Sequence, residues 1–202
     1  MCLEEIGISA IQIFAILNPI SVIPLFLSLT EGRDESEVRR IVGVVSIAIF
    51  IMMSIFSLAG DLILNLMGIS VRGLKIGGGV ILMVLAIDML QGMPRTKSVE
   101  EEELAIVPLS TPLLVGPGTM TTILLLSSKY SRTYGYLCSS LILILASALV
   151  TIASYLILRN SEKLRKILGV NGLRGLSRFM AIIVAATAAD MITSGISDFI
   201  KS

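Results

Sequence analysis

The stretch FAILNPISVIPLFL, residues 14–27, decides the fold because it places two prolines inside an apolar segment. That segment, Ile6–Leu29, is long enough to cross a bilayer, whose hydrocarbon core of ~30 Å needs about 20 helical residues. Pro19 lacks an N–H group and disfavours the α conformation at Asn18, and Pro24 repeats the interruption. The sequence therefore predicts two half-helices with a break at mid-membrane. Backbone groups freed at that depth must face protein or water, since lipid cannot satisfy them.

A matching break follows about a hundred residues later. Gly116-Pro117-Gly118-Thr119 stands at an offset of 98 from Asn18-Pro19-Ile20-Ser21, and it lies at the centre of the apolar segment Leu104–Ser128. Pro108 and Pro112 precede it within the same segment. The fourth membrane segment is therefore predicted to be broken in the same way as the first.

A second repeated sequence pattern links the two halves of the chain. Arg-Gly-Leu at 72–74 leads to Asp88, and Arg-Gly-Leu at 174–176 leads to Asp190, with sixteen residues from arginine to aspartate in both copies. We therefore interpret the 202 residues as a single transmembrane domain, 1–202, made of repeat one, 1–98, and repeat two, 99–202.

The composition, 54% hydrophobic, places the chain in the membrane class. Each repeat holds three apolar segments, an odd number, so the second copy should enter the membrane upside down. The predicted fold is an all-α membrane protein with six transmembrane helices as two inverted three-helix repeats, helices 1 and 4 broken at mid-membrane. Such repeats are typical of small-solute transporters. The six predicted spans are Ile6–Leu29, Ile41–Gly60, Ile76–Gln91, Leu104–Ser128, Thr133–Leu158 and Phe179–Ser197.

The sixteen Lys and Arg residues are unevenly divided between the two sides of the six predicted spans. Five share a side with the termini: Arg72, Lys75, Lys129, Arg132 and Lys201. Eleven lie on the other side: Arg33, Arg39, Arg40, Arg95, Lys97, Arg159, Lys163, Arg165, Lys166, Arg174 and Arg178. The positive-inside rule predicts that the eleven face the cytoplasm. We therefore expect a multi-pass protein of the cell membrane with both termini outside.

Three local patterns give further expectations. Asp34 and Glu37 have the spacing of a capping box and should begin the second span. The segment Arg159–Arg174 has basic residues at helical spacing and is predicted to be a short amphipathic helix on the inner leaflet. Gly73 and Gly77 have GxxxG spacing, which lets another helix approach closely, and should pack the third helix against a broken one.

The paired breaks are the predicted substrate site. The downstream half-helices begin at mid-membrane from opposite sides, so their positive N-terminal ends suit a carboxylate, and the freed carbonyls suit an ammonium group. The alternative is that both breaks are kinks that neighbouring helices satisfy. The predicted substrate-binding residues are Asn18, Pro19, Ser21, Gly116, Pro117, Gly118 and Thr119. None has a large side chain, so we expect a small cavity there.

Asp88 and Asp190 are the only acids inside the predicted spans. A carboxylate in a membrane helix costs about 2.5–3.5 kcal/mol at the helix centre, which makes each a candidate for coupling or gating. The spacing from Arg72 and Arg174 places Asp88 toward the cytoplasmic end and Asp190 toward the outer end. The competing interpretation is an interfacial acid that caps a partner helix.

Other chemistries find little support in the sequence. The chain has no histidine, and its two cysteines, Cys2 and Cys138, give neither a disulfide framework nor a metal motif. No pairing of nucleophile and base can be assembled, so we expect no catalytic residues, no metal and no cofactor, and not an enzyme. No nucleic-acid-binding motif is present. A homo-oligomer is compatible with the sequence.

At these residues the chain resembles the MarC family of integral membrane proteins. The similarity is carried by Asn18-Pro19-Ile20 with Pro24, by Gly77-Gly78-Gly79 leading to Asp88-Met89, and by Pro108, Pro112 and Gly116-Pro117-Gly118 in that order. It extends over essentially the whole chain. The resemblance implies six helices in an inverted three-plus-three arrangement and kinship with LysE-type exporters. The family more often has an amide at the position of Asp190, so no role for this residue carries over.

The resemblance also implies transport of small neutral amino acids, since SnatA-like members carry alanine and glycine. The expected function is a secondary transporter, for uptake or export, that works by alternating access with a zwitterionic amino acid bound between broken helices 1 and 4. Coupling to protons or sodium is left open. The alternatives are a channel, which needs a continuous polar stripe, and a membrane scaffold protein without transport, which needs no midplane breaks.

Overall fold

The computed structural model describes residues 2–91 and 115–200, and it is built from α-helices with no strand in these two ranges. The helices within the two ranges are α1 (Cys2–Leu17), α2 (Ile23–Leu29), α3 (Glu35–Leu66), α4 (Val71–Gln91), α5 (Pro117–Tyr134), α6 (Tyr136–Arg159) and α7 (Ser161–Ile200). The all-helical prediction is therefore confirmed for the described part of the chain.

Four helical stretches within these ranges are long and apolar enough to cross a membrane: Glu35–Gly60, Val71–Gln91, Tyr136–Arg159 and Ser161–Ile200. The first predicted span is not among them because its break divides it into 16-residue α1 and 7-residue α2. The upstream half of the predicted fourth span, 104–114, lies outside the described residues. The arrangement of six spans in an inverted repeat stays a prediction.

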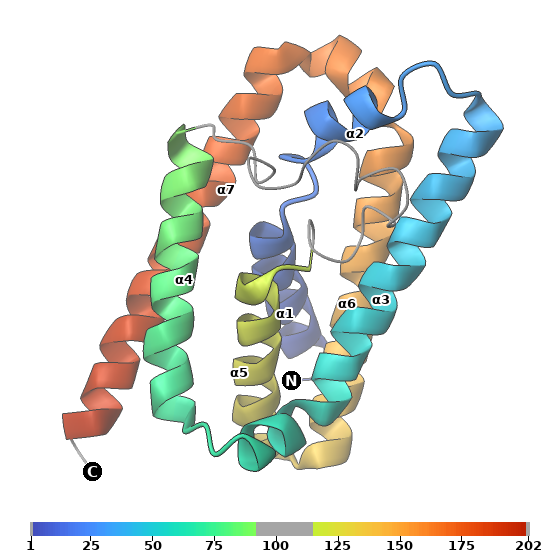
Figure 1. Ribbon diagram of the computed structural model, residues 1–202. Helices are drawn as coiled ribbons and strands as arrows, with labels where there is room; N and C mark the ends of the chain where they lie inside the picture. The colour runs from blue at the N-terminus through green and yellow to red at the C-terminus, as the bar shows by residue number, and fades with distance from the viewer. Residues whose placement is uncertain (1, 92–114, 201–202) are drawn as a thin grey trace.

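The chain runs back and forth between two ends of the molecule (Figure 1). Both termini lie at one end, and α2 and the junction of α6 with α7 lie at the other. Helices α4 and α7 pack together along one side, α3 and α6 pack along the other, and α1 and α5 lie between these two pairs. The two helices that carry the predicted breaks are therefore in the centre of the bundle.

The first break lies where the sequence predicts it. Helix α1 ends at Leu17, Asn18 takes the left-handed conformation with φ 42°, and α2 begins at Ile23. Asparagine tolerates this conformation better than most non-glycine residues, and Pro19 has no N–H group with which to continue the helix. Asn18 is the only non-glycine residue with positive φ in the described ranges. The break is thus a specific turn between two helices.

The helix boundaries elsewhere differ from the predicted ones at several points. The Asp34 cap is confirmed, since its carboxylate accepts the Glu37 N–H at 2.8 Å, and this bond lowers the pKa of Asp34. Helix α3 continues to Leu66, so the chain beyond the predicted end of the second span at Gly60 is still helical. The predicted amphipathic helix at 159–174 is the beginning of α7, which is interrupted by a non-helical Gly169 (φ 64°, ψ 173°).

Glycines allow α4 to lie unusually close to α7. A Cβ on Gly79 would lie 2.6 Å from Ile192 Cγ1 and 2.9 Å from the Ala188 carbonyl oxygen, both on α7. A Cβ on Gly195 of α7 would lie 2.7 Å from Ile76 Cγ1 of α4. These distances are shorter than real Cβ contacts, so only glycine fits without a shift of its neighbours. Small residues at a membrane-helix interface strengthen packing because they let the backbones approach.

The expectation for Gly73 and Gly77 is wrong in its residues. A Cβ on Gly77 would meet no described atom within 4 Å, and one on Gly73 would meet only Ser70, just before the helix. Gly78 instead faces the Thr121 side chain of α5, the described half of the predicted broken fourth span. A GxxxG spacing identifies a candidate face, but the rotation of the helix against its neighbours decides which glycines make contact.

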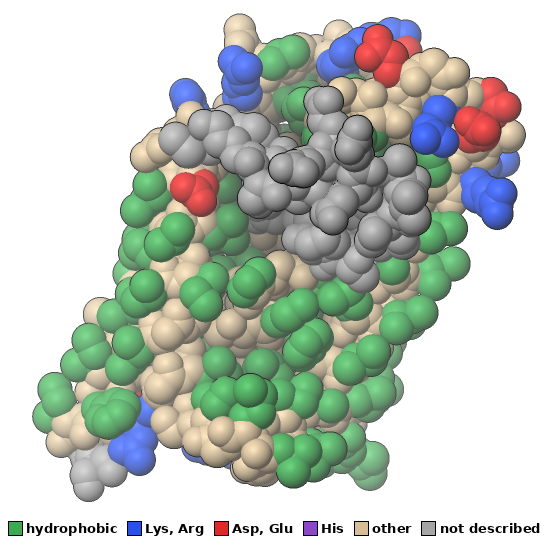
Figure 2. Space-filling model, viewed as in Figure 1, with side chains coloured by type: hydrophobic (Ala, Val, Ile, Leu, Met, Phe, Trp, Pro, Cys, Tyr) green, Lys and Arg blue, Asp and Glu red, His purple; other side chains and the backbone are tan. Residues whose placement is uncertain are grey.

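The surface has the distribution of a protein that sits in lipid. On the face seen in Figure 2, hydrophobic side chains cover the middle of the molecule and charged side chains gather toward the two ends. Large apolar side chains of the peripheral helices are exposed, for example Ile47, Leu137 and Ile182. Exposed apolar surface of this extent on helices of spanning length is expected where the solvent is hydrocarbon.

The close packing of α4 on α7 predicts a large difference between two nearby glycines. Gly79→Ala should destabilise the protein by about 1–3 kcal/mol, because its methyl group overlaps the Ala188 carbonyl and Ile192. Gly77→Ala, on the same helix with open space around it, should be neutral or stabilising by up to ~1 kcal/mol through helix propensity. Thermal unfolding in detergent should separate the variants by about 2–4 °C per kcal/mol. Equal midpoints would show that the two helices do not pack this closely.

Candidate functional site

The side chain of Asn18 lies at the centre of the break and is completely buried. Its Nδ2 donates to Ser177 Oγ of α7 at 3.2 Å, and it lies 4.0 Å from Met89 Sδ of α4. Its Oδ1 is buried without a hydrogen-bond partner among the described residues. Because a buried amide oxygen left unpaired costs about 1–3 kcal/mol, this acceptor is a place where a donor from water or a ligand would be stabilising.

The turn after Asn18 satisfies part of its own backbone. The Asn18 carbonyl accepts hydrogen bonds from the Ser21 N–H at 3.2 Å and from Ser21 Oγ at 2.8 Å. The Ile23 N–H donates to the Ile20 carbonyl at 3.2 Å, which leads into α2. Pro19 is buried and Ser21 is half-buried. The Ser21 hydroxyl, predicted to bind substrate, therefore donates its proton within the turn and helps to shape it.

The second predicted break is described from Val115 onward. Gly116 is the N-cap of α5 in an extended conformation (φ −82°, ψ −179°), and Pro117 occupies the first turn. The Met120 N–H donates to the Gly116 carbonyl at 3.1 Å. The N–H groups of Gly118 and Thr119 come before this first bond of the helix and have no acceptor within it. They lie at the positive N-terminal end of an 18-residue helix.

The structure brings these two regions together at one point. A Cβ on Gly118 would lie 3.4 Å from Ile16 Cγ2, so the start of α5 packs against the end of α1. The same Cβ would lie 2.7 Å from Leu82 Cδ2 of α4. Gly118 is thus a packing contact, and the expectation that it lines a small cavity needs correction. Gly116 differs, because a Cβ there would meet no described atom within 4 Å.

The two half-helices differ in the N-terminal charge that they can offer. Helix α5 has 18 residues, whereas α2 has only seven and begins four residues after Pro19. A helix of two turns aligns few peptide dipoles, so its N-terminal charge is smaller than predicted. Any anion at the breaks would therefore be stabilised chiefly by α5, and Asn18 would offer its unpaired side-chain oxygen to a donor.

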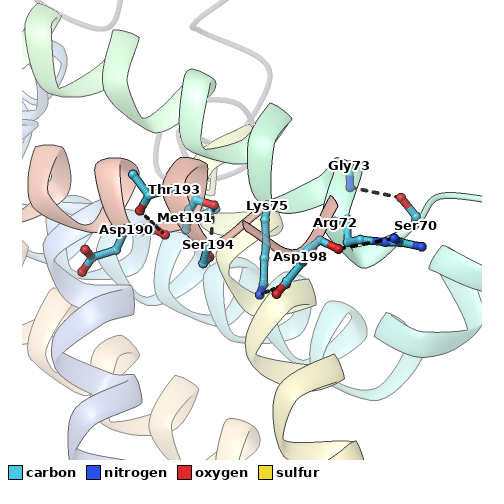
Figure 3. Close-up of polar contacts among 9 residues, drawn as sticks. All are labelled: Ser70, Arg72, Gly73, Lys75, Asp190, Met191, Thr193, Ser194 and Asp198. Carbon is cyan, nitrogen blue, oxygen red and sulfur yellow. Dashed lines mark hydrogen bonds and ion pairs between the residues drawn. The ribbon is translucent and has the colours of Figure 1, made fainter. Parts of the chain in front are cut away.

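The two aspartates have unlike surroundings. Asp88 is half-buried on α4, next to the Met89 that contacts Asn18. Asp190 is exposed on α7 and lines a separate cavity. Figure 3 shows Asp190 on α7 and, further along this helix, Asp198 paired with Lys75 of α4 at 2.8 Å. Of the two aspartates, Asp88 is next in sequence to Met89, which contacts Asn18 at the break. A coupling or gating role for either aspartate stays a prediction.

One polar cluster is not anticipated by the sequence analysis. Tyr130 of α5 donates to Glu5 Oε2 at 2.8 Å and lies 2.9 Å from Ser9 Oγ, and Tyr134 donates to Glu5 Oε1 at 3.3 Å. The predicted first span begins at Ile6 and leaves Glu5 outside, but α1 begins at Cys2. A signal is present in the sequence, because Glu5 and Ser9 are four residues apart and share a helix face.

The described residues do not bring the ligand types that metals require together in one place. No group of three or more His, Cys, Asp or Glu side chains capable of holding a metal ion occurs within 2–91 and 115–200. The polar groups at the break are an amide, hydroxyl groups and backbone N–H groups. Such groups can bind a small polar molecule by hydrogen bonds.

Comparison with known proteins gives the family. The profile of MarC family integral membrane proteins matches residues 3–200. A UPF0056 membrane protein of Methanocaldococcus jannaschii is 34% identical over 193 residues, covering 92% of each chain. The UPF0056 inner membrane protein MarC of Citrobacter koseri is 29% identical over 216 residues, covering 98% of this chain and 97% of its own. No solved structure matches the chain. The protein therefore belongs to the MarC family of integral membrane proteins.

Proposed function

We propose that the protein is a secondary transporter of small neutral amino acids, such as alanine and glycine, which binds its substrate at mid-membrane between the α1–α2 break and the start of α5. The observation that carries the proposal is the Asn18 turn: a buried, left-handed asparagine whose side-chain oxygen has no hydrogen-bond partner among the described residues. This turn follows the end of α1, where Ile16 lies next to Gly118 in the first turn of α5. A broken helix at this depth frees backbone groups that only protein or a water-filled cavity can satisfy, and transporters use such breaks as substrate sites.

The geometry suits a zwitterion of small size. The N–H groups at the start of α5 and its dipole favour a carboxylate, and the Asn18 Oδ1 favours an ammonium donor. A Cβ on Gly116 would meet no described atom within 4 Å, and the proposal assigns this space to the substrate side chain. A substrate with a hydrogen atom or a methyl group as side chain fits such a place better than a branched or aromatic one.

The proposed mechanism is alternating access. Two inverted three-helix halves would move against each other around a shared site that the broken helices form. The pairing of α4 with α7 and of α3 with α6 supports this, because these are the corresponding helices of the two predicted repeats. Asp88, half-buried beside the break's contacts, is the proposed coupling residue, and protons are the proposed ion.

Transport of alanine by the purified protein in proteoliposomes tests the proposal. Uptake should saturate and should be inhibited by glycine and serine but not by leucine or phenylalanine. Gly116→Val should lower alanine uptake by at least about tenfold, because it fills space that the substrate would occupy without overlapping a described atom. The matched control is Gly175→Val on α7, where the added side chain also meets open space at an exposed position.

Two outcomes would contradict the proposed function. The first is a parent protein that is folded in the liposomes and moves no alanine. The second is Gly116→Val with unchanged thermal stability and unchanged alanine affinity, which would place the site elsewhere.

The proposed coupling role makes Asp88 and Asp190 unequal. Asp88→Asn should reduce net alanine flux more than Asp190→Asn and should remove the dependence of that flux on an imposed pH gradient, since the amide cannot take up a proton. Exchange of labelled for unlabelled alanine should survive. If net flux and its pH dependence in Asp88→Asn match those of the parent, Asp88 is structural.

The proposed orientation has both termini outside the cell and the α6–α7 junction in the cytoplasm. It is supported by the excess of Lys and Arg at that junction's end and by the common end of the two termini in Figure 1. Lys163→Cys, at an exposed position and in a background with Cys2→Ala and Cys138→Ala, should react with an impermeant thiol reagent only after cells are permeabilised. Reaction in intact cells would reverse the orientation.

A further inference from the structure

A cavity of ≈ 620 Å³ lies in the half of the molecule that holds the termini, apart from the break. Its walls come from the first turns of α4, from α5 and from the second half of α7, with Gln12 of α1. Along α5 it extends from Thr133, in the last turn, to Thr122, which is about 16 Å at 1.5 Å per residue. The Thr122 hydroxyl donates to the Gly118 carbonyl at 2.9 Å, so the inner end of the cavity is one turn from the start of α5.

The charges that line this cavity are only partly neutralised. Lys75 is paired with Asp198 at 2.8 Å. Lys129 and Arg132 are exposed and have no acidic partner within 4 Å among the described residues, and Lys129 rests over the Tyr130 ring at 5.4 Å. Asp190 likewise has no ion pair in the described part of the chain. Cations and a carboxylate therefore face one cavity without neutralising one another.

Such an arrangement matches a ligand that carries both charges. A carboxylate gains charge-assisted hydrogen bonds from guanidinium and ammonium groups, and an alkylammonium gains them from a carboxylate. The lining adds hydroxyl groups from Thr187 and Ser194, on the same helix as Asp190. Both hydroxyls donate to their own helix, Thr187 to the Ile183 carbonyl at 3.0 Å and Ser194 to the Met191 carbonyl at 3.2 Å, so their oxygen lone pairs remain as acceptors.

We infer that this cavity is an outer recognition site for the α-amino acid head group, in which Lys129 and Arg132 bind the carboxylate and Asp190 binds the ammonium group. The inference rests on the proposed function and deepens it. The outer site admits molecules that carry both charges, while the space beside Gly116 selects by side-chain size. A simple carboxylic acid would meet only half of the site.

Protection of a cysteine inside the cavity tests the inference without depending on transport. Ser194→Cys, half-buried and one turn from Asp190, is placed in a background with Cys2→Ala and Cys138→Ala, and the purified protein is studied in nanodiscs. The introduced cysteine should react faster with an anionic methanethiosulfonate than with a cationic one of similar size. Lys129→Gln with Arg132→Gln should remove that preference. The matched control, Arg40→Gln with Arg165→Gln at the opposite end, should retain it.

The decisive comparison is between alanine and propionate, which lacks the ammonium group. Alanine should protect the introduced cysteine at concentrations about tenfold lower than propionate, because it gains a charge-assisted contact with Asp190. In Asp190→Asn the two should protect at similar concentrations. Equal protection by alanine and propionate in the protein with Asp190 intact, or protection by neither, would overturn the inference.

The experiments can refute the proposed transport and the recognition site independently of each other. Protection by alanine without alanine flux in proteoliposomes would refute the proposed transport and leave the recognition site standing. Alanine flux without protection of the introduced cysteine would refute the recognition site and leave the transport standing.

Discussion

A helix that ends inside a packed bundle leaves backbone groups that only protein or water can satisfy, and the structure is arranged around one such end at Leu17. In the turn at Asn18, the Ser21 hydroxyl donates to the Asn18 carbonyl, and the side-chain amide of Asn18 donates to the Ser177 hydroxyl of α7. These contacts bind the broken helix to the bundle. They leave the buried Asn18 Oδ1 without a partner among the described residues. The proposed function assigns that group to the substrate.

The second constraint is the close packing that surrounds the break. Gly78, Gly79 and Gly195 let α4 approach α5 and α7 closely, and Gly118 lets α5 approach α4. Contacts of this kind tolerate little adjustment, because protein interiors are packed as densely as crystals. Helices α4 and α7 should therefore behave as one unit. In the proposed transport cycle, this unit would move against α3 and α6, with α1 and α5 between them.

The break and its residues could be predicted because a proline acts on its own neighbours. Pro19 fixes the end of α1 whatever surrounds it, and Asp34 caps α3 through a residue three positions away. The partners of these residues could not be predicted. Nothing local pairs Asn18 with Ser177 or Glu5 with Tyr130, more than a hundred residues apart in sequence. The glycines of α4 also look alike in sequence, and only the rotation of the helix decides which of them meet α7.

Hydrogen exchange at single-amide resolution tests whether the break is a hydrated binding site, as the proposed function requires. In nanodiscs, the amides of the non-proline residues within 18–23 should exchange much faster than those in the middle of α3, and saturating alanine should slow them. Leucine, too large for the space beside Gly116, should not. Exchange at 18–23 as slow as in the middle of α3, and unchanged by alanine, would mean that the break is a sealed kink and that the site lies elsewhere.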